Sequence, residues 1–171
     1  MSSNIILVVL GEPNSTFSEL LFKYFKSPLF KKNRNKIVLI GSKKLLMAQM
    51  YQLKYNFKIN EIENIESALL TKVNIININF KFKKAFSKIS KSSNEYIKEC
   101  FDKAISLIKL KNINKLINGP ISKIHFLQKK FPGITEYVAS ITKTNDLVML
   151  IYNEKMAVCP LTTHVPIKNV S

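Results

Sequence analysis

Four short segments of the chain hold the residue types that could do chemistry. They are residues 11–14 (GEPN), 118–123 (NGPISK), 131–136 (FPGITE) and 162–166 (TTHVP). The first two read as turns between a strand and a helix, where free N–H groups at the helix start can bind a ligand. Each segment also has an ordinary structural interpretation, so no single one establishes a site.

The clearest candidate for metal or proton chemistry is His164, directly after a predicted strand. Its imidazole could act as a metal ligand or as a general base. A metal site needs three or four ligands, and the other histidine, His125, lies in a lysine-rich segment without matching spacing. The residues alone leave both roles, and a purely structural one, open.

The other polar candidates fit either ligand binding or local structure. Lys123 could place an ammonium group near an anionic ligand, or it is one solvated lysine among many. Thr135 and Glu136 stand at the start of a predicted helix, where Thr135 at the N-cap or first helical position would act as a cap and Glu136 would favour the helix dipole. Cys100 and Cys159 form no CxxC pair, and we expect two buried free thiols.

The charge balance is strongly basic, with a formal net charge of +16, yet it does not favour a nucleic-acid partner. Arg34 is the one arginine, although arginine dominates specific nucleic-acid contacts. The lysines are spread along the chain, as in a composition rich in Lys, Ile and Asn. We interpret the densest group, Lys81 to Lys91, as a poorly packed connection and not as an RNA-binding platform. A phosphorylated small substrate would also be attracted by this charge.

The hydrophobic share of 46% excludes wholesale disorder. No apolar run approaches the roughly 20 residues that a membrane span needs, and the N-terminus lacks the features of a signal peptide. The absence of a cysteine framework suits a reducing compartment. We therefore expect a cytoplasmic chain without a membrane partner.

The elements that must position these residues alternate between strands and helices, which predicts an α/β fold with a mostly parallel sheet flanked by helices. We expect strands at 5–10, 36–40, 73–80 (an edge or half-exposed strand) and 115–118, and a closing hairpin of 146–152 with 155–161. We expect helices at about 15–25, after Ser42, from Ser93 or Asn94 through Ile108, at 121–130 and at 135–141, with a loop over 81–93.

Taken together, the four segments resemble the 4-hydroxythreonine-4-phosphate dehydrogenase family of vitamin B6 biosynthesis in their order and approximate spacing. The resemblance covers essentially the whole chain but only the N-terminal half of the family's usual length. It implies a fold similar to isocitrate and isopropylmalate dehydrogenases, with a two-lobed subunit in a homodimer. Residues 1–171 are therefore expected to form the N-terminal portion of a longer subunit, incomplete without a C-terminal half.

The resemblance also implies an activity and a set of site residues. The reaction is oxidation of 4-phosphooxy-threonine by NAD (or NADP), followed by loss of CO2. A divalent metal ion (Zn, Mg or Co) is held by three histidines contributed across the dimer. Carried over by motif, the metal ligand is His164, and the residues at or near the substrate are Glu12, Lys123, Ile134, Thr135 and Glu136.

Two departures from the family pattern open alternatives. Residues 15–19 (STFSE) replace a run rich in glycine, and Ile134 stands where the family has a substrate-binding histidine. An isoleucine side chain cannot donate a hydrogen bond or carry charge. The chain could therefore act on a related substrate, such as a threonate or erythronate phosphate or a cyclic dihydrodiol, or be a catalytically dead binding or regulatory lobe. Because one histidine cannot hold the metal, we expect the 171 residues alone to be inactive.

Overall fold

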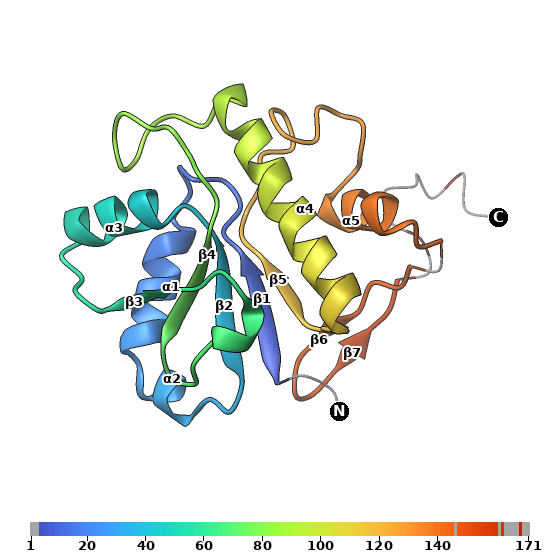
Figure 1. Ribbon diagram of the computed structural model, residues 1–171. Coiled ribbons are helices and arrows are strands. Elements are labelled where there is room, and N and C mark those ends of the chain that lie inside the picture. Colours follow the sequence, from blue (N-terminus) through green and yellow to red (C-terminus); the bar gives the residue numbers. More distant parts are fainter. Residues whose placement is uncertain (1–3, 146, 161, 163–167, 169–171) are drawn as a thin grey trace. The chain divides into compact units, whose positions relative to one another are not determined.

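The computed structural model describes residues 4–145, 147–160, 162 and 168, and it divides the chain into two units, residues 1–126 and 127–171 (Figure 1). Within the described part of the first unit, five parallel strands form one sheet in the order β3-β4-β2-β1-β5. The strands are β1 (Ile5–Val9), β2 (Lys36–Gly41), β3 (Ile59–Glu61), β4 (Val73–Asn77) and β5 (Leu116–Asn118). The predicted α/β class with a mostly parallel sheet is confirmed.

Helices cover both faces of this sheet. They are α1 (Phe17–Lys26), α2 (Pro28–Lys32), α3 (Lys43–Gln52) and α4 (Asn94–Lys111), with short 3-10 turns η1 (Ile65–Ser67) and η2 (Lys91–Ser93). Phe22 of α1 and Leu46 of α3 pack with one face of β1, β2 and β4, and both are almost fully buried. Helix α4 lies across β1 and β2 and buries Phe101 completely (Figure 1). The strands are hydrophobic on both sides because both faces are covered.

Strand β4 differs from its sequence-based prediction. It ends at Asn77, lies between β3 and β2, and buries its first four residues, so the expectation of an edge or half-exposed strand over 73–80 was wrong. The polar residue that suggested exposure, Asn74, is 0% exposed. Its Nδ2 donates to the carbonyl oxygens of Ile37 and Leu69 at 2.9 Å each and to that of Lys72 at 3.1 Å. Its Oδ1 accepts from Leu69 N and Asn60 Nδ2, both at 2.9 Å.

The segment 121–130 also differs from its prediction, because it forms consecutive turns and no helix. Gln128 and Lys129 have φ of 50° and 60°, outside the range of a right-handed helix. Ser122 Oγ accepts a hydrogen bond from His125 N at 3.1 Å, and the Ser122 carbonyl oxygen accepts one from Phe126 N at 2.9 Å, which makes a single turn that does not continue as a helix. His125 itself is half-buried, as expected.

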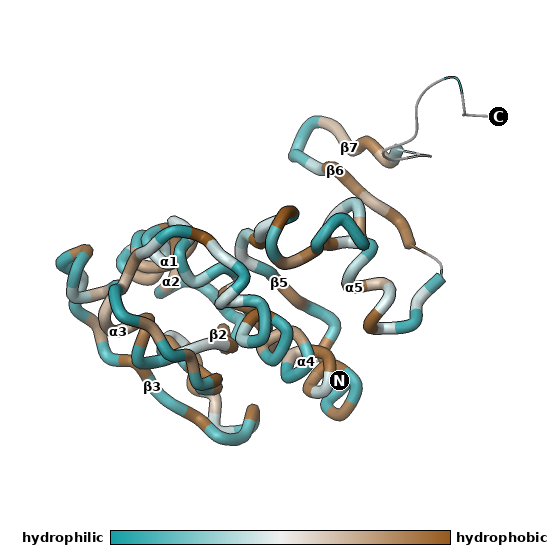
Figure 2. Tube along the Cα trace, turned by 90° about the horizontal axis from the view of Figure 1, so that it is seen from above, coloured by the Kyte–Doolittle hydropathy of each residue, from teal (hydrophilic) through white to brown (hydrophobic). Residues whose placement is uncertain are grey.

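The second unit contains α5 (Ile134–Thr142) and a small antiparallel hairpin of β6 (Ile151–Tyr152) and β7 (Ala157–Val158). The predicted helix and hairpin are confirmed, although the hairpin is much shorter than expected. Cys159 follows β7 and is exposed, so the expectation of a buried thiol there was wrong. Residues 147–151 form a continuous hydrophobic stretch before and into β6, coloured brown in Figure 2, and each is at least 43% exposed.

None of the helices in the described residues is long and apolar enough to cross a membrane.

A substitution at Asn74 tests how much its buried hydrogen bonds stabilise the sheet. Replacing Asn74 with Ala leaves the backbone groups of Leu69, Ile37 and Lys72 without their partner, and we expect a loss of about 3 kcal/mol in the free energy of unfolding. Urea denaturation followed by circular dichroism measures it. The matched change at the exposed Asn79, Asn79→Ala, should alter stability by less than about 0.5 kcal/mol. Equal effects of the two substitutions would contradict this account.

Candidate functional site

The carboxyl ends of the parallel strands meet at one edge of the sheet, where the loops that follow them gather. The loop after β1 contains Gly11, Glu12 and Asn14, and the loop after β5 contains Gly119 and Pro120. In an open parallel sheet this edge is where ligands bind. Two of the four segments singled out in the sequence therefore lie side by side, because β1 and β5 are paired.

The backbones of these two loops are in direct contact. Glu12 N donates to the carbonyl oxygen of Pro120 at 2.8 Å, and Gly119 N donates to that of Val9, also at 2.8 Å. Gly11 has φ of +71°, and a Cβ atom there would lie 2.5 Å from the carbonyl oxygen of Pro120. A Cβ atom on Gly119 would overlap the carbonyl oxygen of Leu10. Glycine is thus required on both sides of the contact.

The buried carboxylate of Glu12 stabilises the loop after β1 through hydrogen bonds. Its side chain is buried, with the residue only 2% exposed. One carboxylate oxygen accepts from Ser93 Oγ at 2.9 Å, and the other accepts from Asn14 N at 3.2 Å and Asn14 Nδ2 at 3.3 Å. Because Ser93 immediately precedes α4, this carboxylate ties the loop after β1 to the start of that helix. The geometry fits the supporting role expected for Glu12 near the site, and direct contact with a substrate stays a prediction.

The space behind this loop is small. A cavity of about 20 Å³ is bordered by Glu12, Ser42, Gln49 and Tyr96, among others. This volume accommodates about one water molecule, so it cannot receive a phosphorylated substrate. Gln49 Nε2 donates to the carbonyl oxygen of Pro13 at 2.7 Å, and Tyr96 Oη accepts from Ser42 N at 2.9 Å. These contacts fix the loop against α3 and α4.

Two titratable groups beneath the loop, Tyr96 and Cys100, have pKa values raised by burial. Burial, with a further contribution from the neighbouring Cys100, raises the pKa of Tyr96 well above its ordinary value. Burial also raises the pKa of the Cys100 thiol to about 12. Neither group is therefore a proton acceptor or a thiolate nucleophile near neutral pH, since both keep their protons. The expectation that Cys100 is a buried free thiol is confirmed.

The remaining candidates occupy different elements. Lys123 is exposed on the turn that follows β5 and Pro120. In the second unit, Gly133 is the N-cap of α5, so Ile134 is the first helical residue and Thr135 the second, and the expectation of Thr135 at the N-cap or first position was wrong by one residue. Glu136 lies in the first turn, where its charge is favourable to the helix dipole, as expected. Ile134, Thr135 and Glu136 are all half-buried.

His164 lies outside the described residues, so its role as a metal ligand stays a prediction. Among the residues that the structure describes, there is no group of three or more His, Cys, Asp or Glu side chains that could hold a metal ion. The described residues therefore do not by themselves make the metal centre that the resemblance implies.

Sequence reasoning missed the residues that hold the loop from other elements. Ser93 was noted only as a helix start, yet its hydroxyl reaches Glu12 across 81 positions of sequence. Gln49 and Tyr96 carry no local signal for contacts with a loop so far away in the chain. A polar residue on the buried stripe of a predicted helix, as Gln49 is on α3, was the one available clue.

A parallel sheet with helices on both faces and its loops gathered at the carboxyl edge defines an α/β protein of the kind that binds ligands at that edge. The chain belongs to the pyridoxal phosphate biosynthetic protein PdxA family, whose model matches residues 33–171. The resemblance drawn from the four segments is thereby confirmed.

Relatives of the chain carry the names of dehydrogenases. It is 29% identical to a 4-hydroxythreonine-4-phosphate dehydrogenase of Sulfurihydrogenibium sp. (strain YO3AOP1), over 96% of this chain and 51% of that protein. It is 32% identical to the enzyme of the same name from Aquifex aeolicus, over 95% of this chain and 50% of that protein. A D-threonate 4-phosphate dehydrogenase of Pectobacterium atrosepticum is 21% identical, over 97% of this chain and 52% of that protein. The chain thus spans about half the length of the curated relatives it matches.

A solved structure supports the fold. The crystal structure of a 4-hydroxythreonine-4-phosphate dehydrogenase from Burkholderia phymatum superposes with a TM-score of 0.80 at 21% identity. The superposition covers 98% of this chain and 52% of that one. At this level of identity the likeness establishes a shared fold.

Gly11 tests the contact between the loops. Gly11→Ala places a Cβ atom against the carbonyl oxygen of Pro120 in a backbone conformation that disfavours L-residues, and we expect a loss of at least about 2 kcal/mol in unfolding free energy. Gly133→Ala is the control, since the nearest atom to its Cβ would be the flexible tip of Glu136 at 3.0 Å. Gly133→Ala should lower the free energy of unfolding by no more than about 1 kcal/mol. Thermal denaturation of both variants measures the difference, and a stable Gly11→Ala protein would refute the requirement.

The two thiols should react very differently. A thiol reagent such as Ellman's reagent at pH 8 should label Cys159 rapidly, because it is exposed, and leave Cys100 unlabelled until the chain is unfolded. The variant Cys159→Ser should consequently show almost no native-state labelling and one equivalent in denaturant. Rapid labelling of the native Cys159→Ser protein would contradict the burial of Cys100.

Proposed function

We propose that the complete protein is a dehydrogenase that oxidises 4-phosphooxy-threonine with NAD (or NADP) in the biosynthesis of vitamin B6. The observation that carries the proposal is the family match over residues 33–171, together with relatives of that name at 29% and 32% identity along nearly the whole chain. Because the chain spans only half of those relatives, the activity is proposed for the complete polypeptide, as a homodimer, and we expect the 171 residues alone to be inactive.

The reaction is the oxidation of a secondary alcohol to a ketone. The carbon loses a hydride, which the nicotinamide cofactor accepts, and the oxygen loses a proton to solvent. The resulting keto acid then releases CO2 and leaves an aminoketone phosphate. We further propose that His164 is this chain's ligand to a divalent metal ion (Zn, Mg or Co).

The described residues support substrate binding in two ways. Thr135 is the second residue of α5, at a helix end whose backbone N–H groups are free to bind an anionic group. Its hydroxyl adds one more donor at the same place. Lys123 is exposed, and its ammonium is free to approach a substrate phosphate or carboxylate. Glu12 supports the loop after β1 through three hydrogen bonds, and its contact with the substrate stays a prediction.

A second candidate substrate is D-threonate 4-phosphate. Ile134 replaces the histidine of the family pattern, so one hydrogen-bonding group at the substrate is lost. Relatives named for this substrate match the chain at 21% identity. A catalytically dead binding lobe is the remaining alternative, favoured by the same residue and by the altered segment 15–19.

Turnover can be measured by the absorbance of the reduced nicotinamide. The complete polypeptide, supplied with a divalent metal ion and NAD, should reduce the cofactor with 4-phosphooxy-threonine faster than with D-threonate 4-phosphate. Thr135→Ala should raise KM by about ten-fold or more, the loss expected for one hydrogen bond to a charged group. Ser140→Ala, at an exposed position of the same helix, should leave KM unchanged within about two-fold.

The outcomes separate the alternatives. Preference for D-threonate 4-phosphate would replace the proposed substrate and keep the reaction class. No reduction of NAD or NADP with either substrate would refute the dehydrogenase and leave the binding lobe.

A further inference from the structure

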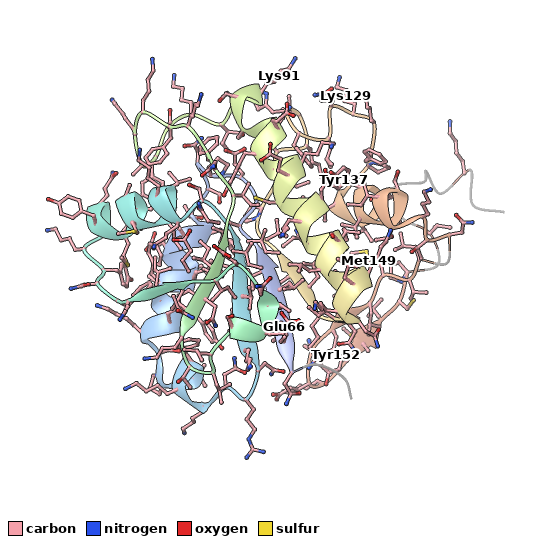
Figure 3. The ribbon with its side chains drawn as sticks, in the orientation of Figure 1. Glu66, Lys91, Lys129, Tyr137, Met149 and Tyr152 are labelled. Carbon is pink, nitrogen blue, oxygen red and sulfur yellow. The ribbon has the colours of Figure 1, made fainter. Side chains whose placement is uncertain are left out.

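The loop between β4 and α4 forms a groove of about 390 Å³ whose wall is strongly basic. Four lysines line it: Lys81, Lys83, Lys84 and Lys88. All four are exposed, and we call this feature the lysine groove. Figure 3 shows nitrogen-tipped side chains projecting from this part of the chain, with Lys91 labelled at the adjoining start of α4.

None of the residues that line the lysine groove is acidic, although Glu95 and Glu99 line the adjoining hollow, with which the groove shares Phe80, Lys81 and Ser92. No acidic residue occurs between Phe80 and Asn94. Within the described residues the four lysines form no ion pair, whereas Lys23, Lys43, Lys98 and Lys111 each pair with a carboxylate. Like charges on neighbouring side chains repel one another, and a bound anion relieves that repulsion.

The loop is a poorly packed connection, as expected, since none of residues 81–92 is buried, but it is anchored at two points. Ser87 N donates to Asn14 Oδ1 at 2.8 Å, and Gln49 Nε2 donates to the carbonyl oxygen of Ala85 at 3.1 Å. At its base, Phe80 packs on Tyr96 with ring centroids 4.6 Å apart. A loop that is already held gives up less conformational freedom when a ligand binds.

The donors in the groove suit phosphate chemistry. Ser87, Ser90 and Ser92 line it beside the lysines, with the Ser90 and Ser92 hydroxyls 2.7 Å apart, and Asn14, whose amide is bonded to Glu12 and Ser87, contributes from the loop after β1. Phosphate oxygens accept hydrogen bonds from both kinds of donor. Asn14 also places the groove next to the loops at the carboxyl edge of the sheet.

The aromatic residues argue against a nucleic-acid platform. The Phe80 ring contacts Tyr96, at a centroid distance of 4.6 Å, and Phe82, at 6.4 Å. Stacking of bases needs free aromatic rings, whereas the Phe80 ring already packs against two rings of the protein. Lysine ammonium groups act as point charges without the planar, paired geometry of arginine, which suits a small phosphate group more than base recognition.

We propose that the lysine groove binds the phosphate group of a small phosphorylated molecule. None of the residues carried over by resemblance is among those that line the groove. It does not rest on the dehydrogenase function, because binding is expected in the absence of cofactor, metal and turnover.

The test is a binding titration of the chain with pyrophosphate, inorganic phosphate and glycerol 3-phosphate, followed by calorimetry or amide NMR shifts. The double variant Lys83→Gln/Lys88→Gln should weaken pyrophosphate binding by about ten-fold or more. The matched control Lys31→Gln/Lys32→Gln removes the same charge from exposed positions of α2. It should change the affinity for pyrophosphate by less than about two-fold. Tighter binding of glycerol 3-phosphate than of inorganic phosphate would identify a phosphomonoester as the ligand, and the reverse order would identify the free ion.

Three outcomes would overturn the proposal. They are the absence of saturable binding by any of the three probes, equal weakening in the two double variants, and binding of a single-stranded oligouridylate that is tighter than pyrophosphate and lost in Lys83→Gln/Lys88→Gln. The last result would assign the groove to nucleic acid. The titration involves no turnover. A failure to bind the phosphate probes would therefore not affect the dehydrogenase proposal, and an inactive enzyme would not affect the proposal for the lysine groove.

Discussion

The contact between the loop after β1 and the loop after β5 is the constraint on which the carboxyl edge of the sheet depends. Two glycine backbones, Gly11 and Gly119, approach until neither tolerates a Cβ atom. The hydrogen bond from Glu12 N to Pro120 then closes the contact, and it also sets where the Glu12 side chain enters the interior. The cavity, the start of α4 and the lysine groove are all arranged around a loop fixed in this way.

Buried polar side chains connect the loop after β1 to helices on both faces of the sheet. Glu12 reaches Ser93 at the start of α4, and Gln49 of α3 reaches both Pro13 and Ala85. Each group has its partners, so burial does not leave it unsatisfied. These side chains thereby connect the loop after β1, the lysine-rich loop and two helices into one structural unit at the edge where ligands bind.

Sequence patterns predicted the fold well where local signals agreed. Strands β1 and β2 are unbroken runs of β-branched and aliphatic residues that stop at or just before a glycine, and α4 shows a clear hydrophobic stripe. The prediction for β4 failed at Asn74. In the sequence a polar residue in a strand suggests an exposed position, whereas the buried Asn74 amide is hydrogen-bonded to neighbouring protein groups. The turns at 121–130 were missed because the left-handed backbone of Gln128 and Lys129, which no helix can contain, leaves no signal in the sequence. For the site, the order of motifs identified the family, but the Glu12–Ser93 pair depends on tertiary contacts that leave no local trace.

The lengths of the strands have a consequence for the behaviour of the chain in concentrated solution. The two outermost strands, β3 and β5, have three residues each, whereas β1, β2 and β4 have five or six. Unpaired N–H and C=O groups on a long border would template intermolecular β-pairing. Within the described residues, a border of three residues offers few such groups for pairing with a strand of another molecule.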